Sequence, residues 1–154
     1  ENDLHGIQVG VGTVYCLGLW EKALALDPAA IDAEACIAAQ PAPQAVREAV
    51  MADWGPEVGA EVWEQWMQKA LDADGLRREI ERFRVTLPKL RTLLAEDLQP
   101  ATTIARCIAT AGGPTRPEDM QAPVHEYYNA LRGARYLRNR FTVLDLAAEL
   151  MLTP

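Results

Sequence analysis

The chain has 154 residues, of which 49% are hydrophobic and 24% are charged, and its formal net charge is −7. This composition excludes an intrinsically disordered chain and suits one domain with a hydrophobic core. The acidic balance argues against nucleic acid as a partner, because binding to phosphates needs a basic surface, and it argues equally against an anionic membrane surface.

Residues 4–26 are predicted to form one helix that contains four glycines. Each glycine costs about 1 kcal/mol relative to alanine, so such a helix needs close packing to be stable. Gly6, Gly10 and Gly18 fall on one face of it. We therefore expect this face to contact another helix or a ligand.

The next three helices are predicted over residues 29–39, 44–54 and 56–71. Asp27 and Pro28 suit the N-cap and the first turn of the earliest of these. Gly55 separates the other two. The last has an apolar stripe of helical period, which places Lys69 on the solvent side.

A heptad-like seam of apolar residues at alternating steps of four and three comes next: Leu76, Ile80, Phe83, Leu87, Leu90 and Leu94. Fewer than four clean heptads are present, which favours packing inside one chain over an intermolecular coiled coil. Pro88 lacks a backbone donor, so a kink or a break is predicted near Thr86.

The last predicted helices span residues 100–111, 123–137 and 143–152, with Thr142 as the N-cap of the final one. No segment shows the period-two alternation of a strand. The chain is therefore predicted to be all-α, a single domain over residues 1–154 with about seven or eight helices.

The three cysteines, Cys16, Cys36 and Cys107, are far apart and lie among apolar neighbours. We expect them to be reduced, buried thiols, which favours a cytoplasmic location. No apolar run is long enough to span a bilayer.

Only two histidines occur, His5 and His125. His125 lies near a predicted helix start and is expected at the surface. His5 lies one turn before Val9 on the glycine-rich helix. Stable metal sites usually have three or four ligands, so the chemistry of a lone histidine favours a structural role.

Arg132, Arg135 and Arg138 follow one another at steps of three, and Arg140 comes soon after. Such a group suits a substrate phosphate, which guanidinium groups bind well. It also suits a solvated face that pairs with carboxylates, and this second interpretation is favoured because surface ion pairs are common. Asp145 is a candidate partner for Arg138 or Arg140.

Three stretches resemble a known family. Residues 4–13, LHGIQVGVGT, resemble the LHGEQVGVGT signature of sn-glycerol-1-phosphate dehydrogenases, relatives of iron-containing alcohol dehydrogenases, glycerol dehydrogenases and dehydroquinate synthases. Residues 134–147, ARYLRNRFTVLDLA, are similar to the closing R-x-R-[FY]-T-V-L-D-L-A stretch of that branch. Residues 111–119, AGGPTRPED, are similar to its G-A-P-T-x-P-E-D loop. The three stretches occur in the family's order.

The resemblance implies the C-terminal helical domain of the dehydroquinate synthase-like fold. In such oxidoreductases an N-terminal domain binds NAD(P), and one Asp and two His hold a divalent metal, typically zinc, iron or nickel. Hydride passes between the nicotinamide and dihydroxyacetone phosphate or a similar ketone, whose carbonyl the metal polarises. His5 matches the second histidine, and the other ligands and the nucleotide-binding domain would lie outside these 154 residues.

By itself the chain is therefore expected to contain no catalytic or cofactor-binding residue, to bind neither metal nor NAD(P), and to be inactive. Ile7 stands where the family usually has glutamate, which puts metal affinity and the exact substrate in question. Two alternatives stay open: a stand-alone helical binding module, and a fragment of a dehydroquinate synthase-like cyclase, against which the closing stretch argues. An exposed glycine-rich face would favour a homo-oligomer.

Overall fold

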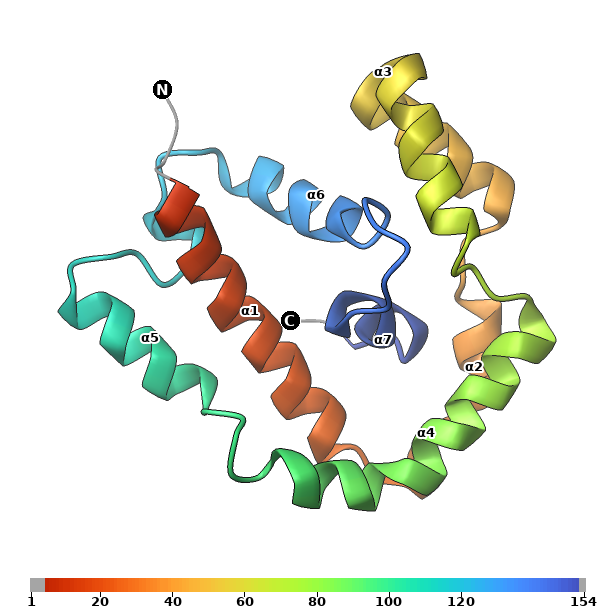
Figure 1. Ribbon diagram of the computed structural model, residues 1–154, viewed down its shortest axis with the longest axis horizontal. Helices are drawn as coiled ribbons and strands as arrows, with labels where there is room; N and C mark the ends of the chain where they lie inside the picture. Colours follow the sequence, from red (N-terminus) through yellow and green to blue (C-terminus); the bar gives the residue numbers. More distant parts are fainter. Residues whose placement is uncertain (1–4, 153–154) are drawn as a thin grey trace.

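The computed structural model describes residues 5–152, and within them it contains seven α-helices and no β-strand, which confirms the predicted all-α class. The α-helices are α1 (His5–Ala25), α2 (Ala33–Ala38), α3 (Pro43–Met67), α4 (Ala73–Leu94), α5 (Ala101–Thr110), α6 (Val124–Ala134) and α7 (Val143–Glu149). Two 3-10 turns, η1 (Pro28–Ala30) and η2 (Pro117–Asp119), lie in the connections. Figure 1 shows α7 near the centre, with α1, α4 and α6 around it and α5 alongside α1.

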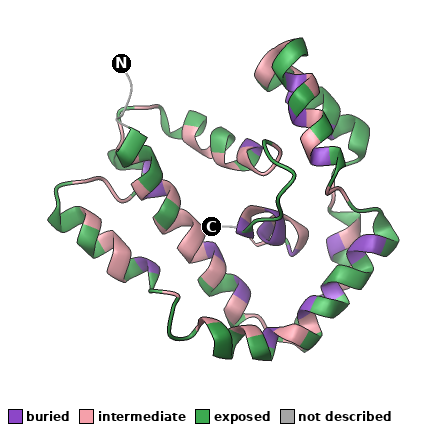
Figure 2. Ribbon diagram, viewed as in Figure 1, coloured by how far each residue is buried: buried purple, intermediate pink, exposed green. Residues whose placement is uncertain are grey.

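The largest hydrophobic core joins α4 to α7 and to the end of α1. Its buried members are Ala23, Ile31, Cys36, Leu76, Ile80, Phe83, Leu87, Leu146 and Leu150. Four of the six residues of the predicted seam belong to it, and Leu90 packs against it. Each large side chain contributes about 1.5–3 kcal/mol when fully buried. The seam therefore packs within the chain, as predicted, and Figure 2 shows buried positions along α4 and in α7.

The break predicted near Thr86 is wrong, because α4 continues through Pro88 to Leu94. Pro88 removes the backbone donor that would otherwise bond to the carbonyl of Arg84. Leu87 is fully buried just before the proline, and Leu90 packs against the same core after it. Burial on both sides of Pro88 holds the helix together across the lost hydrogen bond.

The helix predicted over residues 29–39 is divided into η1 and α2. Asp27 caps η1 as expected, since its carboxylate accepts from the backbone nitrogen of Ala29 at 3.0 Å. Asp32 has an extended backbone and accepts from the nitrogen of Ala35, so it begins a new helix. A second N-cap residue inside the predicted helix thus explains the division.

Gly55 divides α3 into two arms, over residues 43–54 and 56–67, as predicted. Its backbone has a φ of 75° and a ψ of 175°, a left-handed region that favours glycine. The arms fold back on each other (Figure 1) and bury Val46, Val50, Val62 and Trp66 between them.

The close-packed glycine face predicted on α1 is limited to the middle of the helix. A Cβ atom at Gly10 would lie 3.5 Å from Cδ1 of Ile108 in α5. A Cβ atom at Gly6 or Gly18 would meet no atom within 4 Å. The prediction is therefore correct for Gly10 and wrong for the other two positions. The predicted homo-oligomer stays a prediction.

The three cysteines differ in exposure. Cys36 is buried in the main core, Cys16 is half-buried, and Cys107 is exposed on α5. The prediction of burial is thus wrong for Cys107, which lies away from the face that α5 turns toward α1. Among the helices over residues 5–152, none has the length and apolar character that crossing a membrane requires.

Two glycine substitutions test the packing of the helices. In α3, a Cβ atom at Gly59 would lie 3.0 Å from Sδ and 3.1 Å from Cα of Met51. Because backbone has to shift, we expect Gly59→Ala to lower the free energy of unfolding by about 1–3 kcal/mol. Gly18→Ala has open space and should raise it by about 0.5–1 kcal/mol. Urea denaturation measures both, and equal effects at the two positions would contradict the packing described.

Candidate functional site

His5, the predicted metal ligand, is the first residue of α1, and its side chain is exposed. Among residues 5–152, no three side chains of His, Cys, Asp or Glu are grouped closely enough to hold a metal ion. One histidine does not provide the three or four ligands of a stable site. The part of the chain that is described therefore does not by itself fit the metal that the family resemblance implies. His125, on the first turn of α6, is exposed as predicted.

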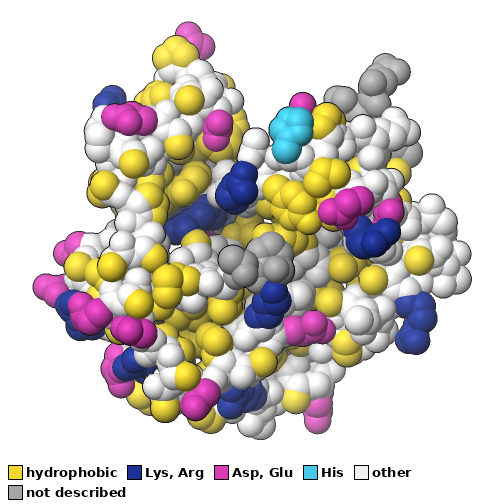
Figure 3. Space-filling model, turned by 180° about the vertical axis from the view of Figure 1, so that it is seen from behind, with side chains coloured by type: hydrophobic (Ala, Val, Ile, Leu, Met, Phe, Trp, Pro, Cys, Tyr) yellow, Lys and Arg dark blue, Asp and Glu magenta, His cyan; other side chains and the backbone are white. Residues whose placement is uncertain are grey.

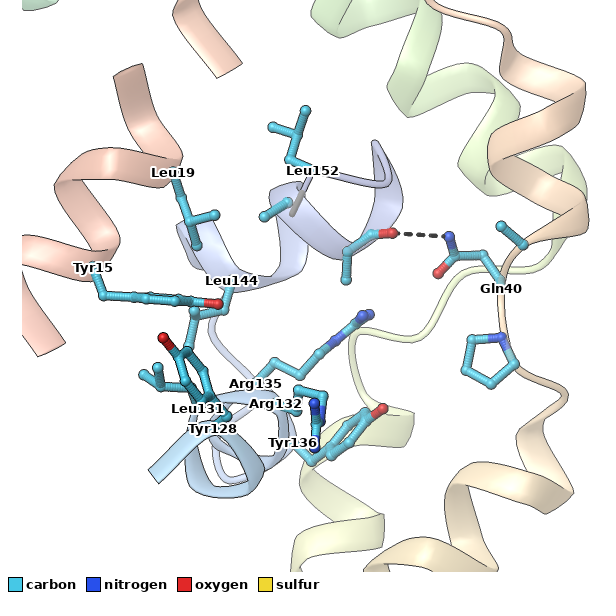
Figure 4. A pocket seen from close by; sticks show the side chains of 14 residues that line it. Tyr15, Leu19, Gln40, Tyr128, Leu131, Arg132, Arg135, Tyr136, Leu144 and Leu152 are labelled. Carbon is cyan, nitrogen blue, oxygen red and sulfur yellow. Dashed lines mark hydrogen bonds between the residues drawn. The ribbon is translucent and has the colours of Figure 1, made fainter. Parts of the chain in front are cut away.

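A cavity of about 420 Å³ lies between α1, α6, α7 and the segment that follows α2. Figure 4 shows Tyr15 and Leu19 entering it from α1, Tyr128 from α6, and Gln40 from the opposite side. The remaining residues of its wall are Ala39, Pro41, Leu131, Arg132, Arg135, Tyr136, Leu144, Ala147, Ala148 and Leu152. The volume falls in the range of small-molecule sites in proteins.

Two of the four arginines singled out in the sequence meet at this cavity. Arg132 on α6 and Arg135 at its C-terminal cap both line the wall, because a step of three residues places them on one side of the helix. Arg138 and Arg140 are exposed and do not line it. In the structure, Arg132 and Arg135 therefore lie at the cavity, whereas Arg138 and Arg140 lie in solvent.

A buried ion pair lies behind the cavity wall. Nζ of Lys69 is 2.8 Å from Oδ1 of Asp145, and the two side chains are only 9% and 3% exposed. The same ammonium donates to the backbone carbonyls of Arg135, at 2.5 Å, and Arg140, at 3.1 Å. The predicted pairing of Asp145 with Arg138 or Arg140 is therefore wrong, and so is the solvent-side placement of Lys69. Lys69 lies just after the end of α3, in the connection to α4.

Asp145 has little capacity left for a further partner. Besides the Lys69 ammonium, its carboxylate accepts from the backbone nitrogen of Thr142 at 2.8 Å and from the Thr142 hydroxyl at 3.0 Å. The hydroxyl of Thr142 in turn accepts from the backbone nitrogen of Leu144, so Thr142 caps α7 as predicted. The carboxylate thus fixes both the ion pair and the start of α7.

Arg135 is left with weak interactions. Its Nε atom is 3.6 Å from Oδ1 of Asp145, beyond hydrogen-bond distance, and this buried nitrogen has no hydrogen-bond partner. Its side chain is 14% exposed, and its guanidinium carbon lies 5.4 Å from the ring centre of Tyr136. The arrangement leaves a mostly buried cation at the wall of the cavity.

Glu149 lies in a second cavity of about 380 Å³, which shares Gln40, Pro41, Arg135 and Tyr136 with the first. Burial raises the pKa of this carboxyl from 4.5 to about 7. The Arg135 guanidinium and the Lys69 ammonium lower this pKa, whereas the carboxylates of Asp145 and Glu79 raise it. The carboxyl of Glu149 is therefore only partly ionised near neutral pH.

The surface above this region is hollowed. Figure 3 shows a depression between the lobe formed by α3 and the rest of the molecule, with Lys and Arg side chains gathered in it and hydrophobic side chains beside them. In a chain with a net charge of −7, such a gathering of cations is a local exception. It makes this region the candidate binding site for an anion.

Comparison with known proteins gives no match. No family model matches the chain, and no match was found among curated proteins or solved structures.

The raised pKa of Glu149 predicts a dependence of stability on pH. The folded state favours the protonated carboxyl, so the free energy of unfolding should fall as the pH rises from 4.5 through about 7. One pKa unit corresponds to about 1.4 kcal/mol, and partial exposure to solvent reduces the expected total to about 2 kcal/mol. Glu149→Gln should remove this fall.

Urea denaturation at several pH values between 4.5 and 8 measures the effect. Glu57→Gln, on the exposed part of α3, is the control for the loss of one negative charge. Parallel pH profiles for the wild type and Glu149→Gln would contradict the burial of this carboxyl.

Proposed function

We propose that this chain is the helical, metal-side part of an NAD(P)-dependent polyol dehydrogenase that resembles sn-glycerol-1-phosphate dehydrogenase. The observation that carries the proposal is the exposed position of the His5 side chain. It is exposed at the start of α1, and it makes no hydrogen bond or ion pair with another described residue. His5 therefore lacks the structural role that the chemistry of a lone histidine favoured. Its place inside a stretch that resembles a metal-binding signature suits a functional role instead.

The surroundings of His5 also suit a contact with a further domain. Space is open beside Gly6, and the apolar side chain of Val9, one turn further along α1, is 51% exposed. Exposed apolar side chains beside a functional residue are typical of surfaces that another domain covers. In the proposed enzyme, the remaining metal ligands and the nicotinamide site would come from sequence outside these 154 residues.

The other two stretches of resemblance have structural roles that fit the same proposal. Thr142 and Asp145, in the closing stretch, cap α7 and anchor Lys69. Gly112, in the loop between α5 and α6, has a φ of 80° and ends α5. These residues would keep the helical part folded, whereas His5 would serve the reaction.

The reaction class that we propose is hydride transfer between a nicotinamide and a ketone such as dihydroxyacetone phosphate. The cofactor would supply the hydride, and the helical part would provide His5 and the wall of the cleft between the domains.

A stand-alone binding module is the second candidate. The observation that favours it is that the cavity with Arg132 and Arg135 has all its walls from this chain. A ligand there would need no second domain.

Expression of the complete open reading frame that encodes this chain tests the dehydrogenase proposal. With zinc or nickel and NADH or NADPH, the product should reduce dihydroxyacetone phosphate, and His5→Ala should lower kcat/KM by more than about 100-fold, because loss of a ligand exceeds the effect of a supporting residue. His125→Ala, an exposed histidine on α6, is the matched control and should have no effect. A product without reductase activity, or activity that survives His5→Ala, would contradict the proposal.

A further inference from the structure

The cavity between α1, α6 and α7 has an unusual balance of charge. The described residues of its wall include two cations, Arg132 and Arg135, and no aspartate or glutamate. The chain as a whole has 22 acidic and 15 basic residues, so a random part of its surface would be expected to contain more carboxylates than cations. Low-dielectric walls strengthen the field of such a pair and favour an anion between or beside them.

Among the described residues, one donor of Arg135 has no acceptor. Its nearest carboxylate, Asp145, already accepts from Lys69 and Thr142, and its buried Nε atom has no hydrogen-bond partner. Leaving a buried charged donor without an acceptor destabilises the fold. An anion in the cavity would offset the charge of this guanidinium group.

Neutral donors accompany the guanidinium groups. The phenol rings of Tyr15, Tyr128 and Tyr136 line the wall, and Figure 4 shows Tyr15 and Tyr128 approaching each other from α1 and α6. Burial raises the pKa of Tyr15, so its hydroxyl stays protonated and can donate. Gln40 is not available in the same way, since its amide nitrogen donates to the carbonyls of Cys36 and Ala148.

The rest of the wall is apolar. Leu19, Leu131, Leu144 and Leu152 line it together with three alanines and Pro41. A bare inorganic ion would leave most of the roughly 420 Å³ unfilled. The wall therefore suits a ligand that has an apolar body as well as a charged group.

We infer that this cavity binds a small organic phosphate monoester. Its dianionic phosphate would lie against the guanidinium groups of Arg132 and Arg135, and its apolar body against Leu19 and the neighbouring leucines. Two guanidinium groups match the charge of a phosphate dianion and supply more donors than a carboxylate can accept.

The inference does not rest on the proposed dehydrogenase function, because the cavity does not include His5. Tyr15 is ten residues further along α1, a distance of about 15 Å at the rise of an α-helix. This exceeds the length of a triose phosphate, so one such molecule does not reach from Tyr15 to His5.

Isothermal titration of the folded chain with phenyl phosphate tests the inference. Saturable binding with one site is expected, and inorganic phosphate and phenol, which each lack one half of the ligand, should bind about tenfold more weakly or worse. Benzoate should also bind more weakly than phenyl phosphate. No saturable binding of phenyl phosphate, or benzoate binding equally well or better, would overturn the assignment to a phosphate monoester.

Three arginine variants locate the site. Arg132→Gln and Arg135→Lys should each weaken phenyl phosphate by about tenfold or more, the second because lysine keeps the charge but loses the planar fork. Arg138→Gln, an exposed arginine outside the wall, is the matched control and should bind as the wild type does. Because Arg132 is exposed, its substitution should leave the melting temperature unchanged. Undiminished binding by folded Arg132→Gln would overturn the location.

Discussion

The buried ammonium of Lys69 joins the two parts of the molecule that would otherwise be least connected. It binds the carboxylate of Asp145 and the carbonyls of Arg135 and Arg140, three partners that are 66 to 76 residues away in the chain. The end of α3 is thereby fixed to the corner between α6 and α7. A charge buried with all its donors used stabilises a single arrangement, whereas loss of one partner typically costs about 3–5 kcal/mol.

The candidate site depends on this arrangement. Lys69 and Thr142 occupy the carboxylate of Asp145, and the guanidinium group of Arg135 lines the cavity without a hydrogen bond to that carboxylate. The aromatic contacts of α3 support the same position, because Trp66 packs edge-on against Tyr136, and a Cβ atom at Gly133 would lie only 2.6 Å from Trp54. The ion pair between Lys69 and Asp145 thus fixes the corner between α6 and α7. It also leaves Arg135 at the cavity wall without a hydrogen bond to Asp145.

Local signals in the sequence predicted much of the fold, and long-range contacts account for what they missed. The helix ends at Gly55 and Thr142 depend on neighbouring residues, so they were predictable. The helical period placed Lys69 toward solvent, but its partners come from a distant segment. The step of three residues predicted that Arg132 and Arg135 lie on one side of a helix. That they line a cavity depends on how α6 lies beside α1 and α7. Exposure at Cys107 likewise depends on which face of α5 meets α1.

A double-mutant cycle between Lys69 and Asp145 tests the central claim most directly. Lys69→Met and Asp145→Asn, alone and combined, would be compared by urea denaturation at neutral pH. If the pair fixes α3 to the α6–α7 corner, the combined variant should lose less stability than the sum of the single variants, with a coupling energy of about 2 kcal/mol or more. Effects that add to within about 0.5 kcal/mol would contradict the claim and remove the structural basis for the position of Arg135.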